Sequence, residues 1–404
     1  MTSLRKNAPL ACVLGDMDLV RPLGLAGIRC AVVGPPGSPA AYSRFTETLL
    51  PWTAGSGGDE ALVDALLRFG AAQRERPVLH IEEDAHLLMV SRHRDRLARA
   101  FRFALADAEL VETLVDKARF QALAERLGLP VPRTRRLHPA AGSEAPDLDL
   151  RYPLIVKPLT RRPPWDSIEG LGKAIRIENP AELRALWPRL IPVGIDLLAQ
   201  ELIPGPETGI ESYHVYIDAR GSVAGEFTGR KIRTYPAEYG HSTALTITDS
   251  RGEGADVAAL GRSLSERMGL RGLAKFDFKR APDGGLHLLE VNPRSTLWHH
   301  LGAVAGVNLP AIVQADLTGA PRPAPAIARP GACWCHISKD RKAAREAGIP
   351  TAQWLAWVAR CEAKAIALDD PMPFLRPKLA RLLPAGTGTA RAHRSGDAVR
   401  TARP

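Results

Sequence analysis

The chain has 404 residues, of which 45% are apolar and 24% are charged, and it contains five cysteines. This length exceeds one ordinary domain, and the balance of residue types is that of a globular protein with a sizeable core. The composition argues against a disordered, fibrous or disulfide-stapled chain, and no apolar run reaches the roughly 18 residues of a membrane span. With few cysteines and no secretory signal pattern, we expect a cytoplasmic protein without a membrane partner.

The formal net charge of +10 comes almost entirely from the C-terminal fifth of the chain. Residues 321–404 contain 15 lysines and arginines against 6 acidic residues, a net charge of +9, which leaves +1 for the preceding 320 residues. A basic end on a near-neutral body is not the pattern of a nucleic-acid-binding domain, and no zinc-finger spacing accompanies it. We therefore do not expect a nucleic-acid partner, and what the basic end contacts stays open.

Residues 1–105 alternate short apolar strands with helices. This alternation favours an open parallel sheet with helical crossovers, and we expect an α/β domain that lines a cleft. The glycines after the first strand lack the spacing of a dinucleotide fingerprint. The expected strands are residues 11–15, 28–34 and 77–83, and the expected helices are residues 19–27 and 60–70.

From about residue 106 the pattern changes to strands separated by turn residues. An amphipathic helix is expected at 116–127, where Gly128 ends it, and another at 180–190. Further strands are expected at 152–159, 173–177 and 211–218, with a strand or hinge at 197–203. After Gly319 a proline-rich linker leads to a last unit that we expect to pack on the body, followed by a disordered basic tail from residue 385.

The segment 272–294 reads GLAKFDFKRAPDGGLHLLEVNPR and predicts a β-hairpin. Two alternating runs flank Asp283-Gly284, which is a strong turn signal. A turn centred there places Asp277 opposite Glu290, and Lys275 opposite Asn292. Side-chain alternation then predicts an apolar opposite face made of Phe276, Phe278, Leu289 and Val291.

Two directly opposed carboxylates repel each other, so Asp277 and Glu290 need a cation, a shared proton or a salt bridge to Lys275 or Lys279. Oxygen ligands without sulfur or imidazole suit Mg²⁺, which takes one or two carboxylates together with substrate phosphates. The alternative is a solvated face with cross-strand ion pairs, and the hairpin alone does not decide between the two.

Two lysines favour the metal site. Lys117 begins a helix, and Lys157 lies inside an apolar strand, where an ammonium group needs an anion or solvent. Between this strand and the next, Gly170 and Gly172 would let backbone amides approach a phosphate. Together these features are typical of a site for a polyphosphate bridged by a metal ion.

The order of motifs resembles the ATP-grasp superfamily. The segments are DK at 116–117 followed by LPVPRT, then YPLIVKP, AQELIPGPE and KFDFK…LLEVNPR. Further segments resemble its carboxylate–amine ligase branch, which includes D-aspartate ligase and predicted ATP-dependent carboligases; they are SRF at 43–45, GRKIRTYP, GHST and WHHLGAVAGVNLP. The resemblance covers about residues 10–320.

The resemblance implies an ATP-grasp fold of mixed α/β and α+β class with a small C-terminal extension. Its parts would be an N-terminal parallel α/β domain, a small nucleotide-binding subdomain and a larger catalytic subdomain built on an antiparallel sheet. The implied boundaries are 1–105, 106–198, 199–320, 321–384 for the extension and 385–404 for the tail.

The resemblance also implies roles in binding ATP. Lys117 and Lys157 would contact the α- and β-phosphates, and the loop with Gly170, Gly172 and Lys173 would close over them. The segment Gln200, Glu201 and Ile203 would be the hinge against adenine, and Glu207 would bind the ribose hydroxyls.

The remaining implied roles concern the metal and the reaction. Asp277, Glu290 and Asn292 would hold Mg²⁺ or Mn²⁺, and Arg294 together with Lys157 would stabilise the transferring phosphoryl group. Asp277 departs from the superfamily, where the first acidic ligand is often Glu, which could lower metal affinity. A small-molecule carboxylate would become an acylphosphate that an amine attacks, and whether the protein is a homodimer stays open.

Contacts to these substrates are harder to assign. In EFTGRKIRTYP, a regular strand would put Arg230 and Ile232 on one face and Lys231 and Arg233 on the other. An arginine there could clamp a substrate carboxylate, although a solvated basic strand fits equally. His241 follows a glycine and could cap the site. Cys333-Trp-Cys-His336 lacks further metal ligands and is expected to be a packing feature.

Two other functions remain compatible with the motifs. An ATP-grasp enzyme could use bicarbonate or a thiol in place of the amine, although no biotin-carrier or glutaminase pattern is present. A module that binds nucleotide without catalysis could instead recruit a partner through the C-terminal extension.

Overall fold

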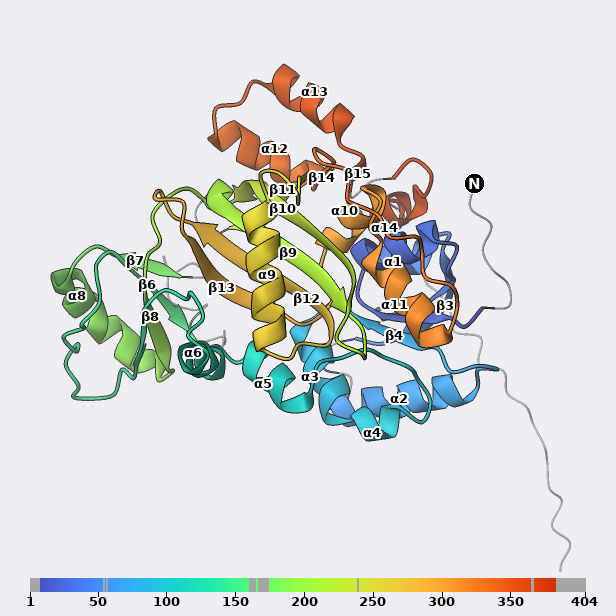
Figure 1. Ribbon diagram of the computed structural model, residues 1–404, viewed down its shortest axis with the longest axis horizontal. Helices are drawn as coiled ribbons and strands as arrows, with labels where there is room; N and C mark the ends of the chain where they lie inside the picture. Colours follow the sequence, from blue (N-terminus) through green and yellow to red (C-terminus); the bar gives the residue numbers. More distant parts are fainter. Residues whose placement is uncertain are drawn as a thin grey trace, which may run out of the picture.

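The computed structural model describes residues 8–53, 55, 57–159, 165, 174–237, 240–364 and 367–382. In these residues the strands form three sheets, which lie side by side along the longest axis of the molecule (Figure 1). The small sheet lies at one end and the N-terminal sheet toward the other, with a large seven-stranded sheet between them.

The N-terminal sheet is parallel and has the strand order β3-β2-β1-β4. Its three expected strands and two expected helices are confirmed, but β3 escaped prediction because exposed residues interrupt its apolar pattern. The strands are β1 (Ala11–Leu14), β2 (Cys30–Gly34), β3 (Thr46–Pro51) and β4 (Val78–Ile81). The helical segments are α1 (Met17–Leu25), η1 (Pro39–Tyr42), α2 (Gly58–Ala71), α3 (Asp84–Arg92) and α4 (Arg94–Leu97).

The small sheet has the order β5-β8-β6-β7 and is antiparallel. Its core includes the buried side chains of Trp165 and Trp187. The strands are β5 (Thr134–Leu137), β6 (Leu154–Pro158), β7 (Ile175–Ile177) and β8 (Leu197–Glu201). Helix α8 (Pro180–Leu190) and η2 (Ile191–Val193) accompany this sheet, whereas α5 (Ala108–Val115) and α6 (Lys117–Arg126), which precede it in the chain, pack into the largest apolar core.

The large sheet has the order β13-β12-β9-β10-β11-β14-β15. Helix α9 (Ala255–Arg267) crosses one face of it (Figure 1), where Phe276 and Phe278 join the largest apolar core. The strands are β9 (Ile210–Ile217), β10 (Val223–Tyr235), β11 (His241–Thr248), β12 (Gly272–Arg280) and β13 (Leu286–Asn292), and η3 (Glu207–Gly209) precedes β9. Helices α10 (Trp298–Val304) and α11 (Leu309–Thr318) follow the hairpin and lie beside α1.

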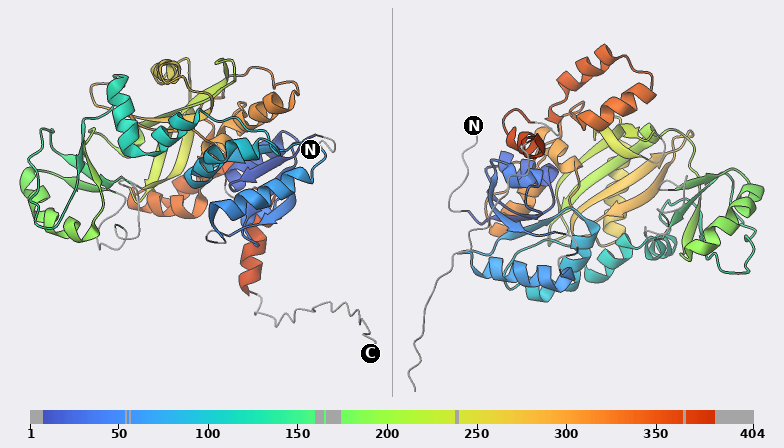
Figure 2. Two further views of the ribbon diagram at one scale, coloured as in Figure 1. Left: turned by 90° about the horizontal axis from the view of Figure 1, so that it is seen from below. Right: turned by 180° about the vertical axis from the view of Figure 1, so that it is seen from behind.

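The C-terminal extension packs on the body, as expected, by adding strands to the large sheet. Strand β14 (Cys333–Cys335) pairs with β11, and β15 (Ala363–Lys364) pairs with β14. Helices α12 (Ile337–Glu346) and α13 (Thr351–Arg360) lie above that end of the sheet, and α14 (Met372–Leu382) returns to the N-terminal sheet (Figures 1 and 2).

Among the described residues, no single helix is long and apolar enough to cross a bilayer. Helices α10 and α11 reach that length and composition only together, and they are bent by 87° at the break between them.

Candidate functional site

A cavity of about 350 Å³ lies between the small sheet and the β12–β13 hairpin. Its walls come from β6, β8, η3, β10, β12 and β13, so distant parts of the chain meet here. The sequence-predicted site residues among its lining are Lys117, Lys157, Gln200, Glu201, Ile203, Glu207, Lys231, Asp277 and Glu290. The volume lies in the range of small-molecule sites, and the lining carries charges of both signs.

The carboxylate of Asp277 is the most constrained acidic group in this cavity. Its pairing with Glu290 across the β12–β13 hairpin is the predicted one. Ser212 Oγ donates to Asp277 Oδ1 at 2.5 Å, and Lys275 Nζ lies 2.5 Å from Oδ2. Burial raises the pKa of Asp277, but the positive charges of Lys275 and Lys231 outweigh burial and lower this pKa to about 2. Asp277 is therefore an anion throughout the physiological pH range.

Glu290 and Asn292 lie on the same side of β13 and lead to Arg294. Asn292 Nδ2 donates to Glu290 Oε1 at 3.1 Å, and Arg294 Nη2 donates to Asn292 Oδ1 at 3.3 Å. Arg294 also contacts the N-terminal sheet, because its Nε lies 2.5 Å from Asp84 Oδ1 and its Nη1 donates to the carbonyl of Glu82 at 2.7 Å. Arg294 thus joins the acidic hairpin to the carboxyl end of β4.

The opposite wall of the cavity carries the two predicted phosphate-binding lysines. Lys157 Nζ donates to Gln200 Oε1 at 3.1 Å, and Gln200 Nε2 donates to Thr134 Oγ1 at 3.1 Å, so the glutamine orients the lysine. Lys117 Nζ donates to the carbonyl of Pro158 at 2.8 Å. Burial, followed by the charge of Lys117, lowers the pKa of Lys157 to about 8, while Glu290 opposes this shift. A polyanion in the cavity would restore the charged form.

The hinge segment and its flank line the same cavity. The side chain of Glu201 binds a main-chain group: its Oε1 accepts a hydrogen bond from the Arg151 amide at 2.9 Å. Lys279 Nζ lies 3.6 Å from Glu207 Oε1. Burial lowers the pKa of Lys279, and Glu207 partly offsets that effect.

The oxygen atoms of Asp277, Glu290 and Asn292 form a donor set that fits a magnesium ion. Two carboxylates and an amide carbonyl oxygen are hard ligands, and Ser212 and Lys275 already hold the Asp277 carboxylate in place. In the part of the chain that the structure describes, no group of three or more His, Cys, Asp or Glu side chains could hold a metal. Phosphate oxygens and water would therefore have to complete the coordination.

The predicted position of Leu289 is wrong. A β-bulge lies between Asp277 and Phe278, where Phe278 pairs with Leu288. Leu288 therefore takes the place in the apolar core, while Leu289 lines the cavity beside Glu290. The extra residue shifts the side-chain alternation by one position beyond the bulge.

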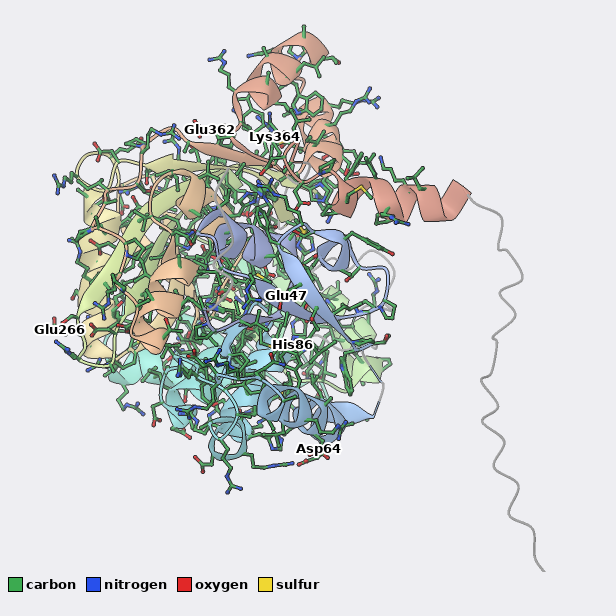
Figure 3. All side chains as sticks on the ribbon, turned by 90° about the vertical axis from the view of Figure 1, so that its right-hand side faces the viewer. Glu47, Asp64, His86, Glu266, Glu362 and Lys364 are labelled. Atoms are coloured by element: carbon green, nitrogen blue, oxygen red, sulfur yellow. The ribbon has the colours of Figure 1, made fainter. Side chains whose placement is uncertain are left out.

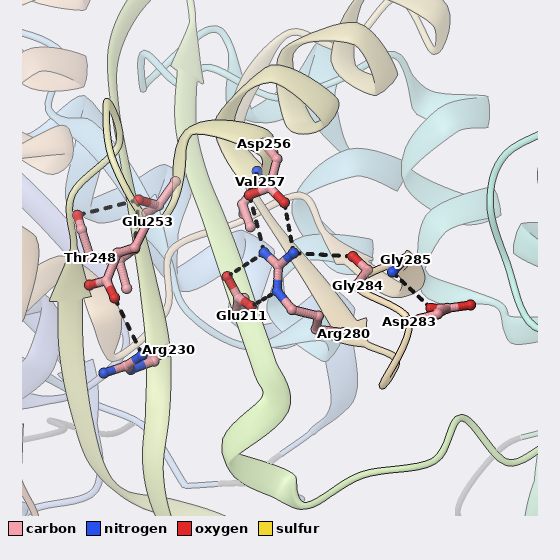
Figure 4. Close-up of polar contacts among 11 residues, drawn as sticks. Glu211, Arg230, Thr248, Glu253, Asp256, Val257, Arg280, Asp283, Gly284 and Gly285 are labelled. Atoms are coloured by element: carbon pink, nitrogen blue, oxygen red, sulfur yellow. Dashed lines mark hydrogen bonds and ion pairs between the residues drawn. The ribbon is translucent and has the colours of Figure 1, made fainter.

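The structure does not bring Arg230 or Arg233 into the cavity lining. Arg230 is exposed and lies 3.4 Å from Glu253, next to the Arg280, Glu211 and Asp256 cluster (Figure 4). Strand β10 is irregular on both sides of Arg233, which therefore does not follow the simple alternation.

Arg233 forms a bidentate ion pair with Asp340 of α12, at 2.8 and 2.7 Å, and its guanidinium lies 4.1 Å above the Trp357 ring. This arginine therefore anchors the C-terminal extension. His241 begins β11 and pairs with Tyr235, next to Gly240 in the cavity wall.

Other predicted features fall elsewhere. Gly170, Gly172 and Lys173 lie outside the described residues. Cys333 and Cys335 are buried in β14, and His336 precedes α12.

Two of the residues beside Asp277 were expected as its salt-bridge partners, and one was not expected. Lys275 pairs with Asp277 as the hairpin indicated, whereas Lys279, on the same face of β12, pairs with Glu207 instead. Ser212 reaches Asp277 only because β9 pairs with β12, and the two residues are 65 positions apart. A pairing between strands so distant in the chain leaves no local sequence signal.

No family model matches the chain. Its curated sequence relatives are all D-alanine–D-alanine ligases. It is 31% identical over 185 residues to a D-alanine–D-alanine ligase of Stutzerimonas stutzeri, covering 44% of this chain and 54% of that protein. A D-alanine–D-alanine ligase of Neisseria meningitidis is 25% identical over 199 residues, covering 46% and 59%. The chain thus spans about half the length of the curated relatives that it matches.

Solved structures resemble a larger share of the chain. An L-amino acid ligase from Bacillus licheniformis is 17% identical with a TM-score of 0.57, covering 78% of this chain and 75% of its own. An N5-carboxyaminoimidazole synthetase from Staphylococcus aureus, solved with ADP, is 14% identical with a TM-score of 0.59, covering 80% and 81%. These likenesses show the fold and confirm the expected one: the chain has the ATP-grasp fold.

Proposed function

We propose that the protein is an ATP- and Mg²⁺-dependent ligase that joins a small-molecule carboxylate to an amine. The observation that carries the proposal is the meeting of Lys117 and Lys157 with Asp277 and Glu290 across one cavity. Such a cavity suits a polyphosphate whose charges are neutralised from one side by ammonium groups and from the other by a metal ion. The likeness to D-alanine–D-alanine ligases supports an amide bond as the product.

The nucleotide would lie in the cavity with its phosphates between Lys157 and the acidic hairpin. Glu207 would bind the ribose hydroxyls, and the backbone from Glu201 to Ile203 would face adenine. Asp277, Glu290 and Asn292 would hold Mg²⁺, which when bound neutralises charge on the transferring phosphoryl group.

In the first step a carboxylate oxygen attacks the γ-phosphorus and ADP leaves; in the second an amine attacks the acyl carbon, phosphate leaves and the amine loses a proton. Arg294 lies beside Asn292 at the N-terminal sheet, where it would hold the acyl phosphate oxygens. The ammonium group of Lys275 would keep a positive charge beside the Asp277 carboxylate while the phosphoryl group is transferred.

Purified protein with ATP, Mg²⁺ and a panel of amino acids and other carboxylates tests the proposal. We expect at least one pair of acid and amine to release ADP and phosphate together with an amide product, identified by mass spectrometry. Intact ATP across the panel, despite measurable ATP binding, would overturn ligase activity in favour of a nucleotide-binding module.

The metal assignment is tested by Glu290→Gln, which removes one carboxylate charge but keeps the side-chain shape. We expect turnover to fall about a hundredfold or more while the unfolding midpoint stays close to that of the wild type. Glu253→Gln is the matched control, because Glu253 is an exposed acid outside the cavity that pairs with Arg230. Equal turnover of the two variants would remove Glu290 from the metal site.

A further inference from the structure

Helix α14 presents an apolar stripe that the other described residues leave partly exposed. Seven large apolar side chains are exposed among the described residues, and four of them lie within residues 368–379. These four are Leu368 at 97% exposure, Met372 at 38%, Leu375 at 41% and Leu379 at 50%. An exposed concentration of this kind marks an interaction surface more often than scattered single residues do.

The stripe lies on the side of α14 that faces away from the body. At about 100° per residue, Met372, Leu375 and Leu379 fall within about 60° of one another around the helix axis. Pro373 is buried and Phe374 is half-buried, and they face η1, on which α14 packs. Figures 2 and 3 show the helix projecting from the N-terminal side of the molecule.

Two cations flank the apolar stripe. By the same geometry Arg376 falls about 40° from Met372 on one side, and Lys378 falls about 60° from Leu375 on the other. Both are exposed; the Arg376 guanidinium lies 5.9 Å from the Tyr42 ring, and the Lys378 ammonium lies 3.7 Å from the Phe374 ring. Apolar residues bordered by long basic side chains are typical of helices that lie in the headgroup region of a bilayer.

The charge of the adjoining sequence selects among possible occupants. Residues 371–404 contain seven lysines and arginines and one acidic residue, Asp397. A second copy of the same helix would bring like charges together, and a nucleic acid would leave the leucines exposed. An anionic lipid surface would both attract the cations and bury the apolar stripe.

We propose that α14 binds the surface of an anionic lipid bilayer and holds the protein there. The expectation of no membrane partner rested on the lack of a spanning segment, and a helix that lies in the interface needs none. The cavity between the small sheet and the hairpin is lined by none of the α14 residues, so lipid binding and nucleotide binding are separable.

Sedimentation of the full chain with lipid vesicles tests this proposal. We expect vesicles with about 30 mol% phosphatidylglycerol to bind at least about tenfold more protein than pure phosphatidylcholine at about 0.1 M salt. The double substitution Leu375→Glu with Leu379→Glu should reduce binding to the anionic vesicles about tenfold or more. ATP binding measured without vesicles should be unchanged, which shows that the variant is folded.

Leu355→Glu is the matched control, because Leu355 is 54% exposed on α13 and lies outside the stripe. It should bind anionic vesicles like the wild type. Equal binding to both lipid compositions, or undiminished binding of the double variant, would overturn the proposal. A concentration-dependent dimer abolished by the double substitution, without vesicle binding, would assign the stripe to a second copy. Binding of single-stranded RNA without vesicle binding would assign the segment to nucleic acid.

Discussion

At the scale of single residues, Lys157 links the charge of the cavity to pH. Its ammonium is partly buried and close to Lys117, and both conditions disfavour the positive charge, so its pKa falls to about 8. A lysine in an unfolded chain titrates near 10.4. Between these two pH values the unfolded chain binds a proton that the folded protein lacks, so folding without ligand becomes more favourable as the pH rises through this window.

Nucleotide binding should show the opposite dependence on pH. Triphosphate favours the charged form of Lys157, so affinity for ATP should be highest below pH 8. It should then fall by up to about tenfold for each pH unit above it. The measurement is calorimetric titration with a non-hydrolysable ATP analogue between about pH 7 and 9.5, where phosphate groups with a second pKa near 6 are already ionised.

Lys157→Arg provides the comparison for this titration, because a guanidinium stays charged over the whole range. Its affinity should be lower than that of the wild type at pH 7, since Gln200 is positioned for an ammonium group. The affinity of the variant should nevertheless be nearly constant up to pH 9.5. Parallel pH profiles for the two proteins would show that another group controls binding.

At the scale of secondary-structure elements, the β12–β13 hairpin shows what local sequence determines. The turn at Asp283-Gly284 fixed the pairing of Asp277 with Glu290, because hairpin register follows turn position. The bulge at Leu289 was not predictable, because no glycine or other local signal marks it. The irregularity of β10 at Arg233 was not predictable either. Arg233 pairs with Asp340 of α12, which lies more than a hundred positions away in the sequence.

Strands β10 and β11 are fastened to the C-terminal extension through one carboxylate. The side chain of Asp340 is fully buried and accepts hydrogen bonds from Arg233, Thr243 Oγ1 at 2.8 Å and Trp354 Nε1 at 2.9 Å. The same two strands lead to Lys231 and Gly240 in the cavity wall. The extension therefore holds one side of the candidate site.

Replacing Asp340 with Ala should lower the free energy of unfolding by about 3–5 kcal/mol, because it leaves the largely buried Arg233 charge without its partner. ATP affinity should fall as well. Urea denaturation and calorimetry measure the two effects. Glu346→Ala changes an exposed acid on the same helix and should leave both quantities within about 0.5 kcal/mol of the wild type. A loss in Asp340→Ala no larger than in this control would contradict the anchoring role.

At the scale of the whole molecule, the sequence predicted the parts better than their connections. The alternation of strands and helices indicated the N-terminal sheet, and the motif order indicated where nucleotide and metal would meet. Some contacts that tie the extension to the body join residues more than 300 positions apart, such as Ser43 with Asp370. Hydrophobic periodicity in a single sequence does not predict such contacts, because each contact depends on how complete sheets pack together.

The turn at Asp369–Asp370 closes the molecule by returning the chain to the N-terminal sheet. Asp370 is buried and accepts hydrogen bonds from Ser43 Oγ at 2.5 Å and from the Arg44 amide at 3.1 Å. Asp369 is 44% exposed and pairs with Arg21 and Arg44. Both carboxylates hold α14 against η1: removing Asp370 leaves the Ser43 hydroxyl and the Arg44 amide without their acceptor, and removing Asp369 takes an acceptor from the buried Arg21.

Asp370→Ala should therefore release α14 while the rest of the fold persists. Losing a buried acceptor costs about 1–3 kcal/mol, which corresponds to roughly a tenfold to hundredfold larger population of the detached segment. Lysyl endopeptidase should cut the Lys378–Leu379 bond faster by that factor, measured by mass spectrometry against time. Glu362→Ala removes an exposed ion pair with Arg329, worth about 0–1 kcal/mol, and should accelerate cleavage only a few-fold. Equal acceleration in the two variants would mean that the hydrogen bonds of Asp370 do not hold the segment.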